Sequence, residues 1–174
     1  ISFHDTTRWP AVFRLEAHID RLFRSAELLD MTLPYSKEAL CDAVVSTIKR
    51  NRLSQGFIKI ICFYPEISFE IIPPERQLSV SVFALDPEQD RGAQGDRSTE
   101  GTTVYVSNWR KLDPRTVPIE AKAAANYLNG MVARLESQKK GFKHAIMLDT
   151  EGYIAEGGTE SVFLVKDGCL LTPS

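Results

Sequence analysis

The feature that most constrains the fold is a repeated change in the spacing of apolar residues along the chain. Apolar residues recur at helical spacing over about 14–30, and again in a run that Ser36 introduces as a helix cap. The spacing then becomes that of strands, with β-branched and aromatic residues over 57–64 and strict alternation over 78–84. This order of elements predicts an α+β, mixed α/β fold.

The second half of the chain again combines helix-like and strand-like segments, but these segments are shorter. A short strand is expected at 103–107, and a helix at 123–140 that ends at Gly141. Glycine-containing turns then separate four predicted strands, at 144–149, 153–156, 161–165 and 169–171. Between the two halves, 86–101 is charged and nearly without apolar residues, which predicts a loop that is either long and on the surface or disordered.

Two prolines within 113–118 indicate an extended connection between domains. We therefore expect a small α+β domain at 1–112, a linker at 113–118, and the first part of a larger, β-rich domain at 119–174. The chain opens without Met and stops directly after a strand-like run. We expect it to be a piece of a longer protein.

Composition excludes several classes of function. The 174 residues include 21 Lys and Arg against 23 Asp and Glu, so there is no basic excess to bind nucleic acid. No apolar run reaches the roughly 18 residues that span a bilayer, and the N-terminus has no signal pattern. The three Cys and three His show neither disulfide nor metal-ligand spacing, which favours a metal-free protein of the reducing cytoplasm.

Lys122 is the most informative candidate for chemistry. It lies among alanines at an expected helix start, where the helix dipole disfavours an ammonium and favours the neutral, nucleophilic amine of a Schiff base. The alanines would also let a flat ring approach the backbone. The alternative is a solvated lysine paired with Glu120 or Asp113. Tyr127 is either a core tyrosine or a hydrogen-bond donor to the same ligand.

Two further charged residues have both a functional and an ordinary interpretation. Glu156 ends a strand before two glycines, where a carboxylate could keep a heterocyclic nitrogen protonated or simply be exposed. Arg21 has no acid at helical spacing, whereas Arg24 has Asp20 and Glu27. Arg21 is therefore free to bind an anion such as a phosphate, or is a solvated surface arginine.

Lys59 lies mid-strand among apolar residues, where an unpaired ammonium would be costly. It either extends to solvent at an edge or faces a cavity that holds an acid. Gly92 and Gly95 neither follow a strand nor open a helix, so a dinucleotide-binding loop is rejected.

Taken together, these segments resemble the class IV (fold-type IV) pyridoxal-phosphate (PLP) aminotransferases, especially the branched-chain amino acid aminotransferases. FRLEAHIDRLFRSA at 13–26 is similar to the family's first long helix, and IEAKAAANYL at 119–128 to the segment that bears its lysine. GYIAEGGTESVF at 152–163 is similar to its strand pair. The resemblance implies a two-domain, D-amino-acid-aminotransferase-like PLP fold whose second domain is incomplete in this chain.

The resemblance also implies roles for individual residues. Lys122 matches the lysine that forms the Schiff base with PLP, and Tyr127 the tyrosine that contacts the cofactor's phenolic oxygen. Glu156 matches the partner of the pyridine nitrogen, and Arg21 the arginine that contacts the phosphate. Glu160 resembles a glutamate common in the branched-chain subgroup.

Three departures limit the resemblance. Branched-chain enzymes usually carry Tyr-Ile-Arg where this chain has Phe57-Ile58-Lys59, which leaves the substrate range open. An early strand with a Phe-Glu-Gly-x-Arg pattern is not found before Phe13. Further phosphate-binding turns of the family would follow Ser174.

The implied activity is transamination of branched-chain L-amino acids, with 2-oxoglutarate as acceptor, by a cytoplasmic homodimer. The alternatives are a D-amino-acid aminotransferase or an aminodeoxychorismate lyase of the same fold, or a paralogue that binds without catalysis.

Overall fold

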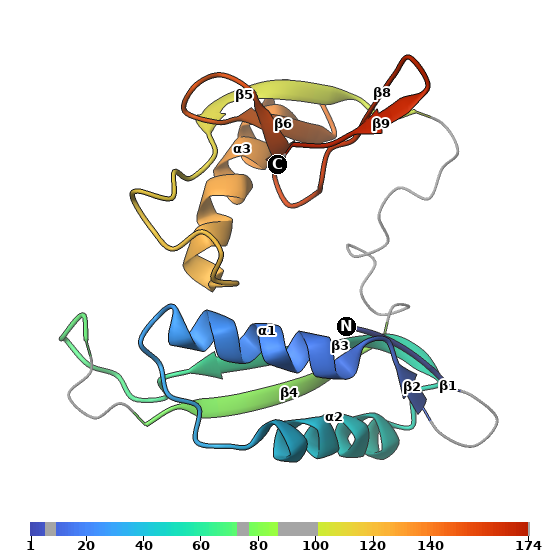
Figure 1. Cartoon of the computed structure of the whole chain (residues 1–174), viewed down its shortest axis with the longest axis vertical. Coiled ribbons are helices and arrows are strands. Elements are labelled where there is room, and N and C mark those ends of the chain that lie inside the picture. The colour runs from blue at the N-terminus through green and yellow to red at the C-terminus, as the bar shows by residue number, and fades with distance from the viewer. Residues whose placement is uncertain (6–9, 73–76, 87–100, 174) are drawn as a thin grey trace. The chain divides into compact units, whose positions relative to one another are not determined.

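The computed structural model describes residues 1–5, 10–72, 77–86 and 101–173 (Figure 1). Its contacts divide the chain into two compact units, Ile1–Gly95 and Asp96–Ser174. Each unit has its own sheet and its own small apolar core. The mixed α/β fold predicted from the spacing of apolar residues is confirmed.

A four-stranded antiparallel sheet forms the base of the first unit. In sheet order its strands are β2 (Pro10–Val12), β1 (Ser2–Asp5), β3 (Gln55–Phe63) and β4 (Ser79–Leu85). β3 and β4 are the two strands predicted from the sequence. β1 and β2 precede Phe13, where the sequence indicated no strand. They are short, and β1 is held by pairing with β3, which is distant in the sequence.

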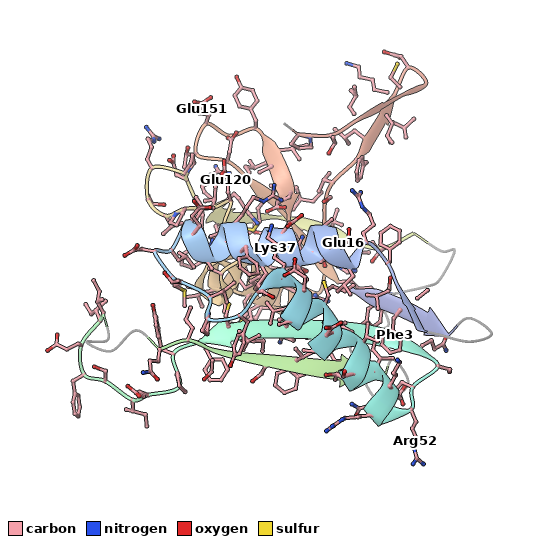
Figure 2. The ribbon with its side chains drawn as sticks, turned by 60° about the horizontal axis from the view of Figure 1, so that its bottom comes forward. Phe3, Glu16, Lys37, Arg52, Glu120 and Glu151 are labelled. Carbon is pink, nitrogen blue, oxygen red and sulfur yellow. The ribbon has the colours of Figure 1, made fainter. Side chains whose placement is uncertain are left out.

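The first unit has two helices, α1 (Leu15–Glu27) and α2 (Lys37–Asn51), which pack against each other, and α2 packs against the sheet. The predicted cap is confirmed, because the Ser36 hydroxyl accepts a hydrogen bond from the Ala39 N–H at 3.2 Å. Figure 2 shows α2 running across β3 and β4. The buried core between helix and sheet consists of Phe3, Val44, Ile48 and Ile58.

The two faces of β3 differ in exposure. Gly56 and Ile58 are buried, whereas Phe57 and Lys59 are exposed on the other face. A Cβ at Gly56 would lie 2.4 Å from the Leu85 carbonyl oxygen, so only glycine fits between the neighbouring strands there. Lys59 therefore belongs to the open face of the sheet.

The second unit is a β–α–β arrangement with one added strand. β5 (Val104–Arg110) runs parallel to β6 (His144–Leu148), and β7 (Ile154–Gly157) pairs antiparallel with β6. The crossover from β5 to β6 contains a 3₁₀ turn, η1 (Ala124–Asn126), followed directly by α3 (Tyr127–Lys139). A small core of Ala133, Ala145 and Met147 lies between α3 and β6.

A separate two-stranded hairpin follows, formed by β8 (Leu164–Lys166) and β9 (Cys169–Leu171). Its turn has positive φ at Asp167 (51°) and Gly168 (76°), the conformation that an Asp-Gly turn favours. The predicted Lys-Asp-Gly turn is therefore present.

The compact units divide between Gly95 and Asp96, whereas the sequence predicted a linker at 113–118. The difference arises because β5 pairs with β6, which places 113–118 inside the second unit. Asp113 accepts a hydrogen bond from the Thr150 hydroxyl at 3.1 Å, which ties this segment to the turn after β6. Prolines indicate an extended chain, but they do not reveal which long-range strand pair that chain connects.

Most of the loop predicted at 86–101, including Gly92 and Gly95, lies outside the described residues. Within the described ranges, no helix is long and apolar enough to cross a membrane.

Candidate active site

Lys122 and Tyr127 are brought together at the beginning of α3. The Lys122 Nζ donates a hydrogen bond to the Tyr127 hydroxyl and lies 5.0 Å from the centre of the tyrosine ring. The regular helix begins only at Tyr127, so Lys122 precedes both α3 and the η1 turn. Lys122 therefore does not lie in the first turn of the helix, where the sequence predicted it. Its amine contacts the Tyr127 phenol and not the backbone N–H groups of a helix N-terminus.

The segment that carries Lys122 is held by backbone turns and one amide side chain. The Ala121 N–H donates to the Pro118 carbonyl at 3.1 Å, and the Ala123 N–H to the Ala121 carbonyl at 2.8 Å. The Asn126 amide donates to the Ala121 carbonyl at 3.1 Å. Ala121 is buried while Lys122 is exposed, so these contacts fix the backbone and direct the lysine outward.

Glu156 lies on β7, opposite Met147 of β6. Its carboxylate forms an ion pair with Lys111, which directly follows β5. The Glu156 side chain is 40% exposed, so it is partly sheltered and open on one side. Sequence reasoning did not assign a role to Lys111, because only the pairing of β5 with β6 brings it near Glu156.

The glycines after Glu156 allow the turn to lie directly on α3. A Cβ at Gly130 of α3 would lie 1.9 Å from the Gly158 carbonyl oxygen, which no side chain could occupy without displacing the backbone. The two backbones therefore touch at Gly130 and Gly158. This contact sets how far the β7 turn stands from the helix that follows Lys122.

Glu160 closes the same turn through several contacts. Its backbone carbonyl accepts the Gly157 N–H at 2.7 Å, and its carboxylate accepts the Thr159 N–H at 2.9 Å. The carboxylate also lies 3.7 Å from Arg134 of α3 and 3.6 Å from His144 of β6. Partial burial alone would raise the pKa of Glu160, but the hydrogen bonds from Thr159 and the nearby cations outweigh it and lower the pKa. Glu160 thus holds the turn to α3 and β6.

Arg21 and Lys59 lie in the first unit. Arg21 is exposed on α1, and its Nη2 is 3.3 Å from the His18 Nδ1. Partial burial and then the positive charge of Arg21 lower the pKa of His18. No carboxylate among the described residues pairs with Arg21, in agreement with the sequence argument. Lys59 is exposed on the open sheet face, opposite Phe83 of β4.

One local charge argument from the sequence is wrong. The sequence predicts that Asp20 pairs with Arg24, but Asp20 forms an ion pair with Lys37 of α2. The Lys37 Nζ also lies 5.5 Å from the centre of the Phe23 ring. Because α1 packs against α2, Lys37 lies beside Asp20, and the spacing of residues within α1 alone cannot predict this pair.

Comparison with known proteins places this arrangement in a family. The pattern of amino-transferase class IV matches residues 3–174. A probable branched-chain-amino-acid aminotransferase of Rickettsia bellii is 35% identical over 162 residues, which are 93% of this chain and 54% of that protein. The chain belongs to the class IV aminotransferase family.

Solved structures agree with this assignment. The branched-chain aminotransferase of Thermoproteus uzoniensis with norvaline is 33% identical, with a TM-score of 0.83 over 99% of this chain and 57% of that one. The T.th. branched-chain amino acid aminotransferase with pyridoxamine 5'-phosphate is 27% identical, with a TM-score of 0.83 over 99% of this chain and 55% of that one. The chain spans about half the length of the relatives it matches.

Proposed function

We propose that the protein containing this chain is a PLP-dependent aminotransferase that transfers the amino group of branched-chain L-amino acids to 2-oxoglutarate. The observation that carries the proposal is the contact of the Lys122 amine with the Tyr127 phenol, in a chain that the class IV pattern matches over 3–174. Relatives named branched-chain aminotransferases support the substrate class.

The second unit offers groups that fit the ring end of PLP. The aldehyde carbon and the phenolic oxygen are neighbours on that ring, and the Lys122 amine and Tyr127 hydroxyl are neighbours here. Half-buried or exposed alanines at 123–125 leave room beside Lys122 for a flat ring. Glu156, partly exposed beside two glycines, offers the carboxylate that a ring nitrogen requires. We therefore assign Lys122, Tyr127 and Glu156 to the ring. The proposal that Arg21 binds the phosphate is supported within the first unit by its exposed guanidinium, which pairs with no carboxylate among the described residues.

When bound, PLP supplies an electron sink for negative charge at the substrate α-carbon. Lys122 would hold the cofactor, and its amine would be the base that moves the proton at the substrate α-carbon. Tyr127 orients the amine through its hydroxyl. Glu156 holds a proton on the ring nitrogen, and the guanidinium of Arg21 neutralises phosphate charge.

We assign Lys59 and Glu160 to the substrate side with different roles. Lys59, on the open sheet face, is a cation for a substrate carboxylate. Glu160 affects the substrate side indirectly. Its carboxylate, near Arg134 and His144, holds the turn after β7 in place.

We also propose that the protein acts as a homodimer in the cytoplasm. Three apolar side chains on α3 are about half exposed in this chain, which supports a packing partner for that face: Leu128, Met131 and Leu135. Light scattering of the purified full-length protein tests the dimer. A monomer at micromolar concentration would contradict it.

Borohydride reduction of the full-length protein with PLP, followed by peptide mapping, tests the lysine. The pyridoxyl group should be found on Lys122, because its amine lies beside Tyr127. A label on Lys59 or Lys111 instead would reject the assignment.

A panel of amino donors tests the reaction. With 2-oxoglutarate as acceptor, L-leucine, L-isoleucine and L-valine should be converted, and D-alanine should not. Conversion of D-amino acids alone would favour a D-amino-acid aminotransferase.

A further inference from the structure

Lys111 and Glu156 approach each other across β6 from opposite sides. The Lys111 backbone N–H donates to the Leu148 carbonyl of β6 at 2.8 Å, which fixes the end of β5. Glu156 stands opposite Met147 in the antiparallel pair of β6 and β7. The ion pair between the two side chains therefore joins the two strands that flank β6.

This ion pair is less exposed to solvent than the pair between α1 and α2. The Lys111 and Glu156 side chains are 26% and 40% exposed, compared with 52% for Lys37 and 49% for Asp20. In the part of the chain that the structure describes, Lys111 is the one side chain that forms an ion pair with Glu156. A lysine with a fixed backbone and a partly covered side chain limits the orientations that its partner can take.

We propose that Lys111 is a positioning residue that orients Glu156 toward the ring nitrogen of the cofactor, an inference that rests on the proposed function. A carboxylate has two oxygens and about four lone-pair sites. An ammonium on one side fixes the orientation of the group, and the remaining lone pairs accept the N–H of a protonated ring nitrogen. Lys111 thus acts through Glu156 and does not need to touch the cofactor.

The test compares two ligands on the purified full-length protein without cofactor. One is PLP, and the other is its analogue in which a C–H replaces the ring nitrogen. Dissociation constants are measured for wild type, Lys111→Met, Lys111→Arg and the control Lys166→Met. Lys166 is an exposed lysine of β8, so its variant removes the same charge away from Glu156.

We expect Lys111→Met to weaken PLP binding by about tenfold, the size of one charge-assisted hydrogen bond, and to leave the analogue unchanged. Lys111→Arg should restore most of the affinity, and Lys166→Met should bind both ligands as wild type does. Equal losses for the two ligands would mean that Lys111 only stabilises the fold. Unchanged or tighter PLP binding would mean that Lys111 competes with the cofactor for Glu156. Either result overturns the inference.

A second measurement examines the pair without any ligand. Melting temperatures of Lys111→Met, Glu156→Gln and the double variant should be non-additive by about 1–3 °C, as for a partly exposed ion pair. Additive shifts would overturn the pairing itself. If wild type bound neither ligand, the proposed function would fail, whereas the thermal cycle would still report on the pair.

Discussion

At the scale of single residues, Arg21 and Arg24 are a matched pair on one helix. Both lie on α1, and neither forms an ion pair with a carboxylate among the described residues, but Arg21 also contacts His18. We expect Arg21→Ala to weaken PLP retention by at least tenfold, because a guanidinium on a phosphate is a charge-assisted contact. Equilibrium dialysis of the full-length protein measures the retention.

Arg24→Ala is the control for Arg21. It removes the same charge from the same helix and should leave PLP retention near that of wild type. Equal losses in the two variants would mean that the whole flank of α1 is merely solvated.

Gly130 permits a close contact between the backbone of α3 and the turn that follows β7. Gly130→Ala places a methyl group 1.9 Å from the Gly158 carbonyl oxygen, so the helix or the turn has to move. We expect a loss of about 1–3 kcal/mol in the free energy of unfolding, the usual cost of overpacking. Urea denaturation measures it, and Gly101→Ala, whose added methyl would contact nothing within 4 Å, should change it little. A similar loss in both variants would point to a general glycine effect.

At the scale of elements, one carboxylate joins α3 to an irregular part of β5. Glu136 accepts hydrogen bonds from the Ser107 hydroxyl at 2.6 Å, and from the Asn108 N–H at 3.1 Å and side-chain amide at 2.5 Å. The register of β5 against β6 shifts between Val106 and Arg110, so strand pairing does not satisfy this stretch alone. The Glu136 carboxylate of α3 therefore supplies the hydrogen-bond acceptor that this bulged stretch of β5 lacks within the sheet.

We expect Glu136→Ala to loosen the bulge in β5 while α3 keeps its helical structure. Amide hydrogen exchange should become faster at Asn108 than in wild type, because its backbone N–H loses the Glu136 carboxylate as acceptor. Glu120→Ala, which removes a carboxylate ahead of α3, is the control. Unchanged exchange at the Asn108 amide would contradict the role given to Glu136.

At the scale of the whole molecule, lowered carboxyl pKa values predict how stability depends on pH. The hydrogen bonds from Arg115 are the largest cause that lowers the pKa of Asp113, and those from Ser107 the largest for Glu136. The pKa of Glu160 is also lowered. A carboxyl whose folded pKa lies below its unfolded value adds stability above that value and loses it as the pH falls.

The melting temperature should therefore hold near neutral pH and fall as the pH drops through the ordinary values of 4.5 for Glu and 3.8 for Asp. Scanning calorimetry between pH 7 and pH 3 measures this. A triple variant, Asp113→Asn, Glu136→Gln and Glu160→Gln, should show a shallower fall. A melting temperature that rises on acidification would contradict the assignment of these groups.

The sequence by itself determined the elements whose signals are local. The apolar spacing predicted α1, α2, β3 and β4, and the Ser36 cap was visible as a residue type in front of a helical run. Lys122, Tyr127 and Glu156 became candidate residues because they lie in recognisable local segments. Each of these inferences depends on neighbours within about one turn of helix or one strand.

Only the tertiary structure decided which distant groups meet. β1 and β2 form because β1 pairs with β3, and the segment 113–118 belongs to the second unit because β5 pairs with β6. The partners of Glu156 and Asp20, Lys111 and Lys37, likewise come from other elements. Their spacing along the chain carries no periodic signal, since strand pairing and helix packing join residues by position in space. Local sequence patterns therefore predict the candidate residues, whereas strand pairing and helix packing determine which side chains surround them.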